Sequence, residues 1–166
     1  MSEKRSLGVA SIQIGDIAVD GGVATTFASL GVIYKDTASI EQEAGEEIIH
    51  DAEELDDPIE IVPVKGKTKI VFGIVDFAPA TLVKVLGGTV TGDAPDTKWS
   101  APDAASAIEK SVRVTSKNGV TFTYPRVSLK ARISYKLAKS GIAQVLIEGT
   151  VLQPTKPGTK SCEIDA

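Results

Sequence analysis

The side chains best suited to acid–base or nucleophilic chemistry in this 166-residue chain are one histidine, one cysteine and several neighbouring carboxylates. His50 has no serine or cysteine nucleophile motif beside it, so it lacks the partners that hydrolytic triads use. The pairs Glu46-Glu47 and Glu53-Glu54 lie in a long acidic stretch, which favours a solvated surface over an acid and base pair. A small hydrolase built on such carboxylates would need one of them to have a strongly raised pKa in a cleft. We therefore predict that the protein is not an enzyme.

Motifs for binding metals, phosphate or nucleic acid are also missing from the sequence. His50 and Cys162 are the only residues of their types, which leaves no cluster for zinc, haem or an iron–sulfur centre. The tripeptide Gly66-Lys67-Thr68 lacks the upstream glycine spacing of a phosphate-binding loop. Phe122 and Tyr124 alternate as a strand core does, and aromatic residues are too few for a single-strand stacking platform. We expect no cofactor and no metal.

The composition predicts a mainly β protein with one domain. Val, Ile, Thr and Ala dominate the apolar stretches and aromatic residues make up only 5% of the chain, a bias that favours half-buried strands over a helical bundle. We place a single domain at 1–153, followed by a polar C-terminal arm at 154–166 whose order depends on docking against something else. The N-terminal residues contain neither a signal peptide nor an apolar run long enough for a membrane span, so we expect synthesis in the cytoplasm.

Alternating apolar positions and turn residues predict where the strands lie. Outside one ambiguous segment, they are expected within residues 9–19, 23–34, 59–64, 69–77, 111–115, 120–124, 128–137 and 142–152. The two strands on either side of Lys65-Gly66-Lys67 are predicted to form a hairpin. Asn118-Gly119 predicts a second hairpin with a two-residue type I′ turn. The segment 37–55 fits either a helix or a strand bent at Gly45, and we favour the strand.

One short helix and one long loop complete the predicted elements. Pro79 suits the first turn of a helix, and Gly87-Gly88 suits its end. Residues 89–105 are rich in turn formers and predict an ordered surface loop that Trp99 anchors.

Charge is divided unevenly along the chain, although the net charge is only -4. Residues 36–60 contain eleven Asp and Glu and no Lys or Arg, whereas residues 110–139 contain eight Lys and Arg and no Asp or Glu. Both regions could be solvated faces that partly pair within one subunit. Alternatively, they could meet head to tail between copies and build rings or filaments. The acidic region could also repel a passing polyanion, because like charge opposes close approach.

The order of these features resembles that of bacteriophage tail tube proteins. The resemblance covers about residues 7–153, and its local stretches are Gly8–Gly15, Ala24–Gly31, Ile70–Gly88 and Trp99–Pro102. Proteins of that family form hexameric rings that stack into the hollow tube through which the genome passes, and their relatives include the tubes of contractile injection and type VI secretion systems. The resemblance implies a β-sandwich or partly closed barrel with one short flanking α-helix and a long loop or hairpin excursion at about 37–64.

The resemblance also suggests roles for the charged and apolar residues of the excursion. It places the excursion at the ring-stacking contact or along the tube wall. The candidates for a negative lumen or ring contact are Glu41, Glu43, Glu46 and Glu47. The candidate apolar residues of the stacking loop are Ile40, Ile48, Ile49 and Leu55, and the candidate basic subunit contacts are Arg113, Arg126, Lys130, Arg132 and Lys136.

Taken together, these features predict a structural virion protein of the phage tail that assembles with itself and with other tail proteins into a tube. DNA would pass through without specific binding, because an acidic bore avoids the electrostatic traps that neutralised phosphates create. One alternative is the tube of an injection or secretion system, and another is a non-enzymatic β-sandwich module that binds carbohydrate or protein. An exposed Trp99 beside Tyr34 or Tyr124 would favour sugar stacking, whereas a buried Trp99 would favour a loop anchor.

Overall fold

The computed structural model describes residues 3–166, so the first two residues of the expected domain lie outside the described residues. Its strands are β1 (Ser11–Gly15), β2 (Ala28–Ser29), β3 (Ser39–Gln42), β4 (Glu46–His50), β5 (Glu60–Val64), β6 (Thr68–Ile74), β7 (Thr89–Thr91), β8 (Lys98–Ser100), β9 (Ile108–Thr115), β10 (Thr121–Ser134), β11 (Gln144–Val151) and β12 (Glu163–Asp165). The helix α1 spans Pro79–Leu86, as predicted from Pro79 in its first turn and Gly87-Gly88 after its end. The expected class, mainly β with one short flanking helix, is confirmed.

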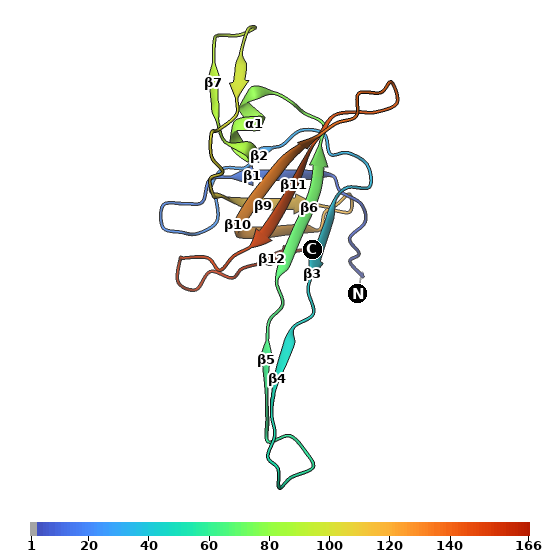
Figure 1. Cartoon of the computed structure of the whole chain (residues 1–166), viewed down its shortest axis with the longest axis vertical. Coiled ribbons are helices and arrows are strands. Elements are labelled where there is room, and N and C mark those ends of the chain that lie inside the picture. The colour runs from blue at the N-terminus through green and yellow to red at the C-terminus, as the bar shows by residue number, and fades with distance from the viewer. Residues whose placement is uncertain (1–2) are drawn as a thin grey trace.

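Most strands belong to one large antiparallel sheet that folds over on itself. The strand order is β2-β1-β9-β10-β11-β6-β3, and β12 also pairs with β10. β12 pairs with the first residues of β10, Thr121–Thr123, and β11 pairs with Val127–Ser134, while β9 pairs with β10 from Thr121 to Leu129 across a register shift. The two halves of the sheet run in clearly different directions (Figure 1). No pairing joins β2 to β3 within residues 3–166, so the fold is sandwich-like and open rather than a closed barrel.

The core lies between the two halves of the sheet and is built by alternation along the strands. In β6, Ile70, Phe72 and Ile74 are at most 2% exposed, while Val71 between them faces outward and is 37% exposed. The helix closes one end of this core with its buried side chains Leu82 and Val85. The other core residues are Ile12, Ile14, Leu30, Val112, Val114, Tyr124, Val127, Leu129, Val145 and Ile147.

A buried hydroxyl fixes the bend in β10. The register between β10 and β9 shifts between Tyr124 and Val127, which marks a bulge. Pro125 lies inside this bulge, where its missing N–H costs no ladder hydrogen bond. Ser111, which is fully buried, donates its hydroxyl to the Pro125 carbonyl over 2.7 Å and accepts the Ala24 N–H over 3.0 Å. One side chain therefore ties the bend to the loop that precedes β2.

The prediction of a hairpin between the strands on either side of Lys65-Gly66-Lys67 is wrong, because these two strands do not pair with each other. β5 pairs with β4 and β6 pairs with β3, so the four strands form one long interrupted hairpin. The interruption lies where the two arms of this hairpin come close together. A Cβ on Gly45 would lie 2.4 Å from the Val64 carbonyl oxygen, and one on Gly66 would lie 1.9 Å from the Glu43 carbonyl oxygen. Glycine is required at both positions because any side chain would collide with backbone. The strand prediction for 37–55, with its break at Gly45, is confirmed.

One predicted turn and one predicted loop differ in detail from the structure. The hairpin of β9 and β10 is confirmed, but Gly119 has a positive φ of 86° and Asn118 does not. The Ser116 N–H donates to the Val120 carbonyl over 2.8 Å, so the loop has three residues and is not a two-residue type I′ turn. The loop predicted at 89–105 contains the hairpin of β7 and β8, whose strands are too short to show an alternating pattern.

The C-terminal arm is docked on its own chain, contrary to the expectation that its order depends on something else. β12 pairs with β10 through Phe122 and Ile164, which face each other in the register. Lys156 forms an ion pair with Asp20 over 2.6 Å. This arm therefore completes the half of the sheet that contains β9.

We predict that Ser111→Ala lowers the free energy of unfolding by about 1–3 kcal/mol, because it leaves a buried N–H and a buried carbonyl without their partner. Urea unfolding followed by circular dichroism measures this difference. Ser134→Ala, at an exposed position near the end of the same sheet, is the matched control and should change stability by less than about 0.5 kcal/mol. Equal effects of the two substitutions would contradict the role assigned to Ser111.

Candidate functional site

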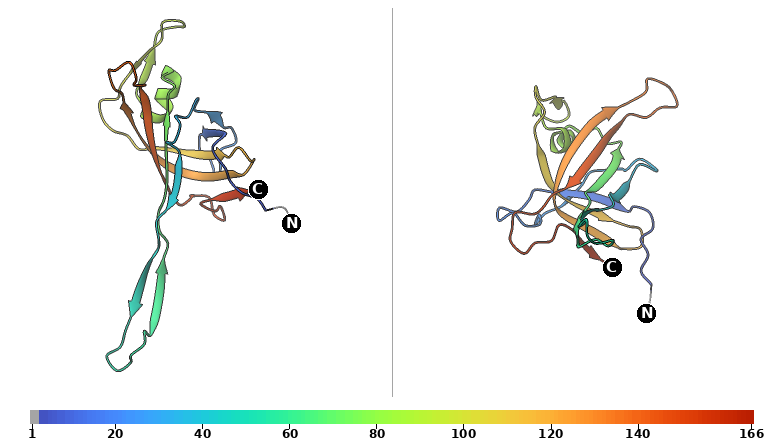
Figure 2. Two further views of the ribbon diagram at one scale, coloured as in Figure 1. Left: turned by 90° about the vertical axis from the view of Figure 1, so that its right-hand side faces the viewer. Right: turned by 60° about the horizontal axis from the view of Figure 1, so that its bottom comes forward.

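The feature most unlike an ordinary surface is the hairpin of β4 and β5, residues 46–64, which we call the acidic hairpin. Its strands pair with each other in a separate two-stranded sheet. In Figures 1 and 2 it projects far from the rest of the molecule. Ile48 faces Val62 and Ile49 faces Ile61 in the register, so each face of the ribbon carries an apolar pair.

These apolar side chains are open to solvent on both faces. All residues of β4 and β5 are exposed, and Ile48 and Ile49 are 50% and 51% exposed. Other exposed apolar residues of this hairpin are Leu55, Ile59, Ile61, Val62 and Val64. A lone two-stranded hairpin is only marginally stable in water, and contiguous exposed apolar surface of this kind marks an interaction site. The acidic hairpin is therefore suited to being covered by another protein chain.

The four candidate glutamates of the lumen do not share one face. Glu43 forms an ion pair with Lys69 over 2.9 Å, and the hydrogen bond and charge of Lys69 lower the pKa of the Glu43 carboxyl. Glu41 also faces Lys69 in the register of β3 and β6. Glu46 and Glu47 are neighbours in β4, so their side chains point to opposite faces of the ribbon.

The candidate apolar residues divide between the body and the acidic hairpin. Ile40 packs against the core, so it is not part of the exposed stacking surface that we predicted. Ile48 and Ile49 lie half-exposed in β4, and Leu55 is 61% exposed in the loop at the far end. Ile61 and Val62 were not among the residues predicted from the sequence. Two adjacent apolar residues in a strand place one side chain on each face, and this pattern could have identified them.

Two of the five candidate basic residues are occupied within their own chain. Arg126 donates two hydrogen bonds to the carboxylate of Glu109, over 2.9 Å and 3.0 Å. The hydrogen bond and charge of Arg126 lower the pKa of the Glu109 carboxyl. The Arg113 guanidinium lies 4.0 Å from the centre of the Phe27 ring, which is a cation–π contact.

The other three candidates lie together at the outer end of the hairpin of β10 and β11. We call residues 130–146 the basic hairpin end; its cations are Lys130, Arg132, Lys136 and Lys139. It also exposes apolar side chains that the sequence analysis did not single out, Tyr135 at 59% and Leu137 at 94%. Figures 1 and 2 show this end pointing away from the acidic hairpin, on the other side of the body.

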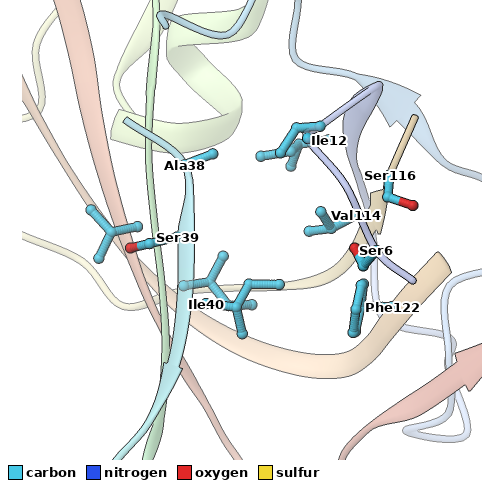
Figure 3. A pocket seen from close by; sticks show the side chains of 12 residues that line it. Ser6, Ile12, Ala38, Ser39, Ile40, Val114, Ser116 and Phe122 are labelled. Carbon is cyan, nitrogen blue, oxygen red and sulfur yellow. The ribbon is translucent and has the colours of Figure 1, made fainter. Parts of the chain in front are cut away.

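An apolar pocket of about 360 Å³ lies on the open side of the sheet, between β3 and the ends of β1 and β9. Ile12, Ile40, Val114 and Phe122 gather around it (Figure 3). Its lining consists of apolar, glycine and serine residues, so it offers no group that titrates near neutral pH. This pocket can accept apolar surface but has no means of acid–base catalysis.

The residues with potential for chemistry lie apart from this pocket. His50 is exposed at the end of β4 and faces Glu60. Cys162 is half-buried beside Tyr124, whose phenol has a raised pKa because of burial and the nearby cysteine. Across residues 3–166, no group of three or more His, Cys, Asp and Glu side chains is arranged to hold a metal ion.

Comparison with known proteins adds no family. No protein-family model matches the chain, and none of the curated proteins matches it. Over the same described residues, none of the helices has the length and apolar character needed to cross a membrane.

We predict that Glu109→Gln makes stability less sensitive to acid. Because Arg126 lowers the pKa of Glu109 in the folded state, the ion pair stabilises the protein above the unfolded pKa near 4.5, and this contribution disappears as pH falls through the lowered folded pKa. Urea midpoints at about pH 6 and about pH 3 should differ less for Glu109→Gln than for the unmodified protein. Glu53→Gln, in the exposed loop of the acidic hairpin, is the control and should leave the difference unchanged.

Proposed function

We propose that this protein is a non-enzymatic structural subunit that assembles with copies of itself into a tube, as in a bacteriophage tail. The observation that carries the proposal is the acidic hairpin, whose two faces both expose apolar side chains. A ribbon with this pattern gains stability only when other chains cover it. Copies of the same chain are always present at matching concentration, which makes them the simplest partners.

The resemblance to tail tube proteins supports the tube among the possible assemblies. It covers most of the chain, and the open sandwich with one flanking helix and a long hairpin excursion fits the layout that it implies. In such an assembly, rings would stack into a hollow tube that other tail proteins cap, and the virion tail would be its location. Carboxylates of the acidic hairpin that a neighbouring copy leaves uncovered would suit a surface that DNA passes without binding.

A carbohydrate-binding module draws no support from the residue that would distinguish it. Trp99 is half-buried against the core, and its ring N–H donates to the Gly87 carbonyl over 2.8 Å. Tyr124 is buried, at 3% exposed, so it presents no ring beside Trp99 for a sugar to stack on. This is the arrangement that we expect of a loop anchor.

Light scattering over a concentration series, with negative-stain electron microscopy of the same samples, tests the proposal directly. We expect rings or tubes that grow with concentration. Partial loss of assembly in high salt would show that charge contributes to the contacts. Strictly monomeric protein at every concentration, including in the presence of its tail partners, would contradict the proposal.

We predict that the double substitution Ile49→Thr with Ile61→Thr raises the concentration needed for assembly by at least about tenfold, because it removes one apolar face of the acidic hairpin. Threonine keeps the β-branched shape, and both positions are about half-exposed, so the melting temperature of the monomer should stay unchanged. Val19→Thr, at an exposed loop position elsewhere, is the control. Normal assembly of the double variant would show that this face is not a contact.

A further inference from the structure

We propose that the acidic hairpin of one copy docks on the basic hairpin end of the next copy. This inference rests on the proposed function, because it names the partner surface that the assembling chain provides for the same hairpin. It goes further by assigning a direction to the contact and a particular set of side chains to each side.

Charge complementarity is the first argument. The acidic hairpin contains eight Asp and Glu and no Lys or Arg: Glu46, Glu47, Asp51, Glu53, Glu54, Asp56, Asp57 and Glu60. The basic hairpin end contains four Lys and Arg and no Asp or Glu. None of the ion pairs formed among residues 3–166 uses a charge from either surface. Both sets of charges are therefore available to an incoming copy, and their opposite signs favour and steer the encounter.

The positions of the two surfaces exclude pairing within one chain. They lie on opposite sides of the body along its long axis (Figures 1 and 2). A copy can therefore use its acidic hairpin toward one neighbour and its basic hairpin end toward another at the same time. Such a heterologous contact repeats from copy to copy, which closes a ring or extends a filament.

A groove on the basic side provides a matching shape. It has a volume of about 290 Å³ on the outer face of β6, β10 and β11, and its lining includes Lys130, Arg132, Val71 and Leu146. Glu148 also lines it and faces Lys130 in the register, whereas Arg132 faces Leu146. The groove therefore combines an apolar floor with a guanidinium that has no carboxylate opposite it.

The acidic hairpin presents the complementary pattern at strand spacing. Glu46 and Ile48 are two residues apart in β4, so they point to the same face. Lys130 and Arg132 are likewise two residues apart and share a face of β10. A strand laid over the groove can therefore place a carboxylate near a cation while its isoleucine covers the apolar floor.

Exposed apolar side chains lie beside the charges on both surfaces. In the basic hairpin end, Tyr135, Leu137 and Ile142 are 59%, 94% and 51% exposed. Covering them with the isoleucines of the acidic hairpin removes apolar area from water on both sides. Salt does not screen this contribution as it screens the charge pairs, so high salt should weaken the contact without abolishing it.

Two charge-reversal variants test the pairing. The basic-side variant carries Arg132→Glu and Lys136→Glu, and it leaves Lys130 intact because that residue faces Glu148. The acidic-side variant carries Glu46→Lys in β4, at the position placed over the groove, and Glu54→Lys in the exposed loop. The matched controls reverse the same number of exposed charges elsewhere, as Lys98→Glu with Lys160→Glu and as Asp93→Lys with Asp96→Lys. Sedimentation velocity over a concentration series measures assembly, and thermal melts verify that each variant is folded.

Each reversal variant alone should need at least about tenfold more protein to assemble, because like charges then meet at every contact. An equal mixture of the two should assemble near the concentration of the unmodified protein. The unchanged acidic hairpin of the basic-side variant can then dock on the unchanged basic hairpin end of the acidic-side variant, and the two reversed surfaces can also pair with each other. The controls should assemble normally.

The possible failures are distinguishable. Absence of assembly by the unmodified protein would overturn the proposed function and this inference with it. Normal assembly of the unmodified protein and of both reversal variants would overturn this inference alone. Impaired assembly of both variants without recovery in the mixture would also overturn it, because the two surfaces would then contact something other than each other.

A cross-linking measurement that does not depend on charge provides a second test. Leu55→Cys and Leu137→Cys place thiols at exposed positions of the two surfaces. A short bismaleimide should join the two variants into mixed dimers far more efficiently than either variant alone. Equal yields in the mixed and separate samples would contradict the docking, and the unmodified protein measures the background from Cys162.

Discussion

The bend in β10 is the constraint on which the rest of the structure depends. One strand takes part in both halves of the sheet: it pairs with β12 before the bulge and with β11 after it, while β9 pairs with it on both sides of the bulge. Pro125 lies at the bulge, and the hydroxyl of Ser111 holds its carbonyl. Because the sheet turns here, the side chains of β1 and β9 can face those of β6 and β11 and form a single core.

The same bend determines where the two candidate surfaces point. The last part of β10 continues with β11 beyond the core, and there its alternating apolar residues are exposed to solvent because no other element packs against them. On the opposite side, β3 and β6 continue past the close crossing at Gly45 and Gly66 into the acidic hairpin. One core therefore carries two exposed extensions of opposite charge: the acidic hairpin continues β3 and β6, and the basic hairpin end continues β10 and β11.

Local patterns in the sequence predicted the positions of individual strands and of the helix better than they predicted which strands pair with each other. Alternation located β11 and both parts of β10, although it predicted two separate strands at 120–124 and 128–137 where the structure has one, and Pro79 with Gly87-Gly88 located the helix. The partner of β5 could not be predicted, because Lys65-Gly66-Lys67 has the composition of a turn. In the fold the chain continues through this segment from β5 into β6, and each of these strands pairs with a strand from the other arm of the long hairpin. The segregation of charge was visible in the sequence, but Ile48-Ile49 alone does not distinguish a strand buried on both faces from one exposed on both.

The collinear path from the acidic hairpin into the sheet has a mechanical consequence. A neighbour that holds the acidic hairpin and pulls along its length transmits the force directly into β3 and β6, which run in nearly the same direction (Figure 1). The hydrogen bonds between β6 and β11 lie perpendicular to the strands, so such a force loads the ladder from Val145 to Thr150 in shear. Its bonds then resist together rather than opening one at a time. Tension along this path is thus borne by β6 and β11, which are among the best-buried strands of the molecule.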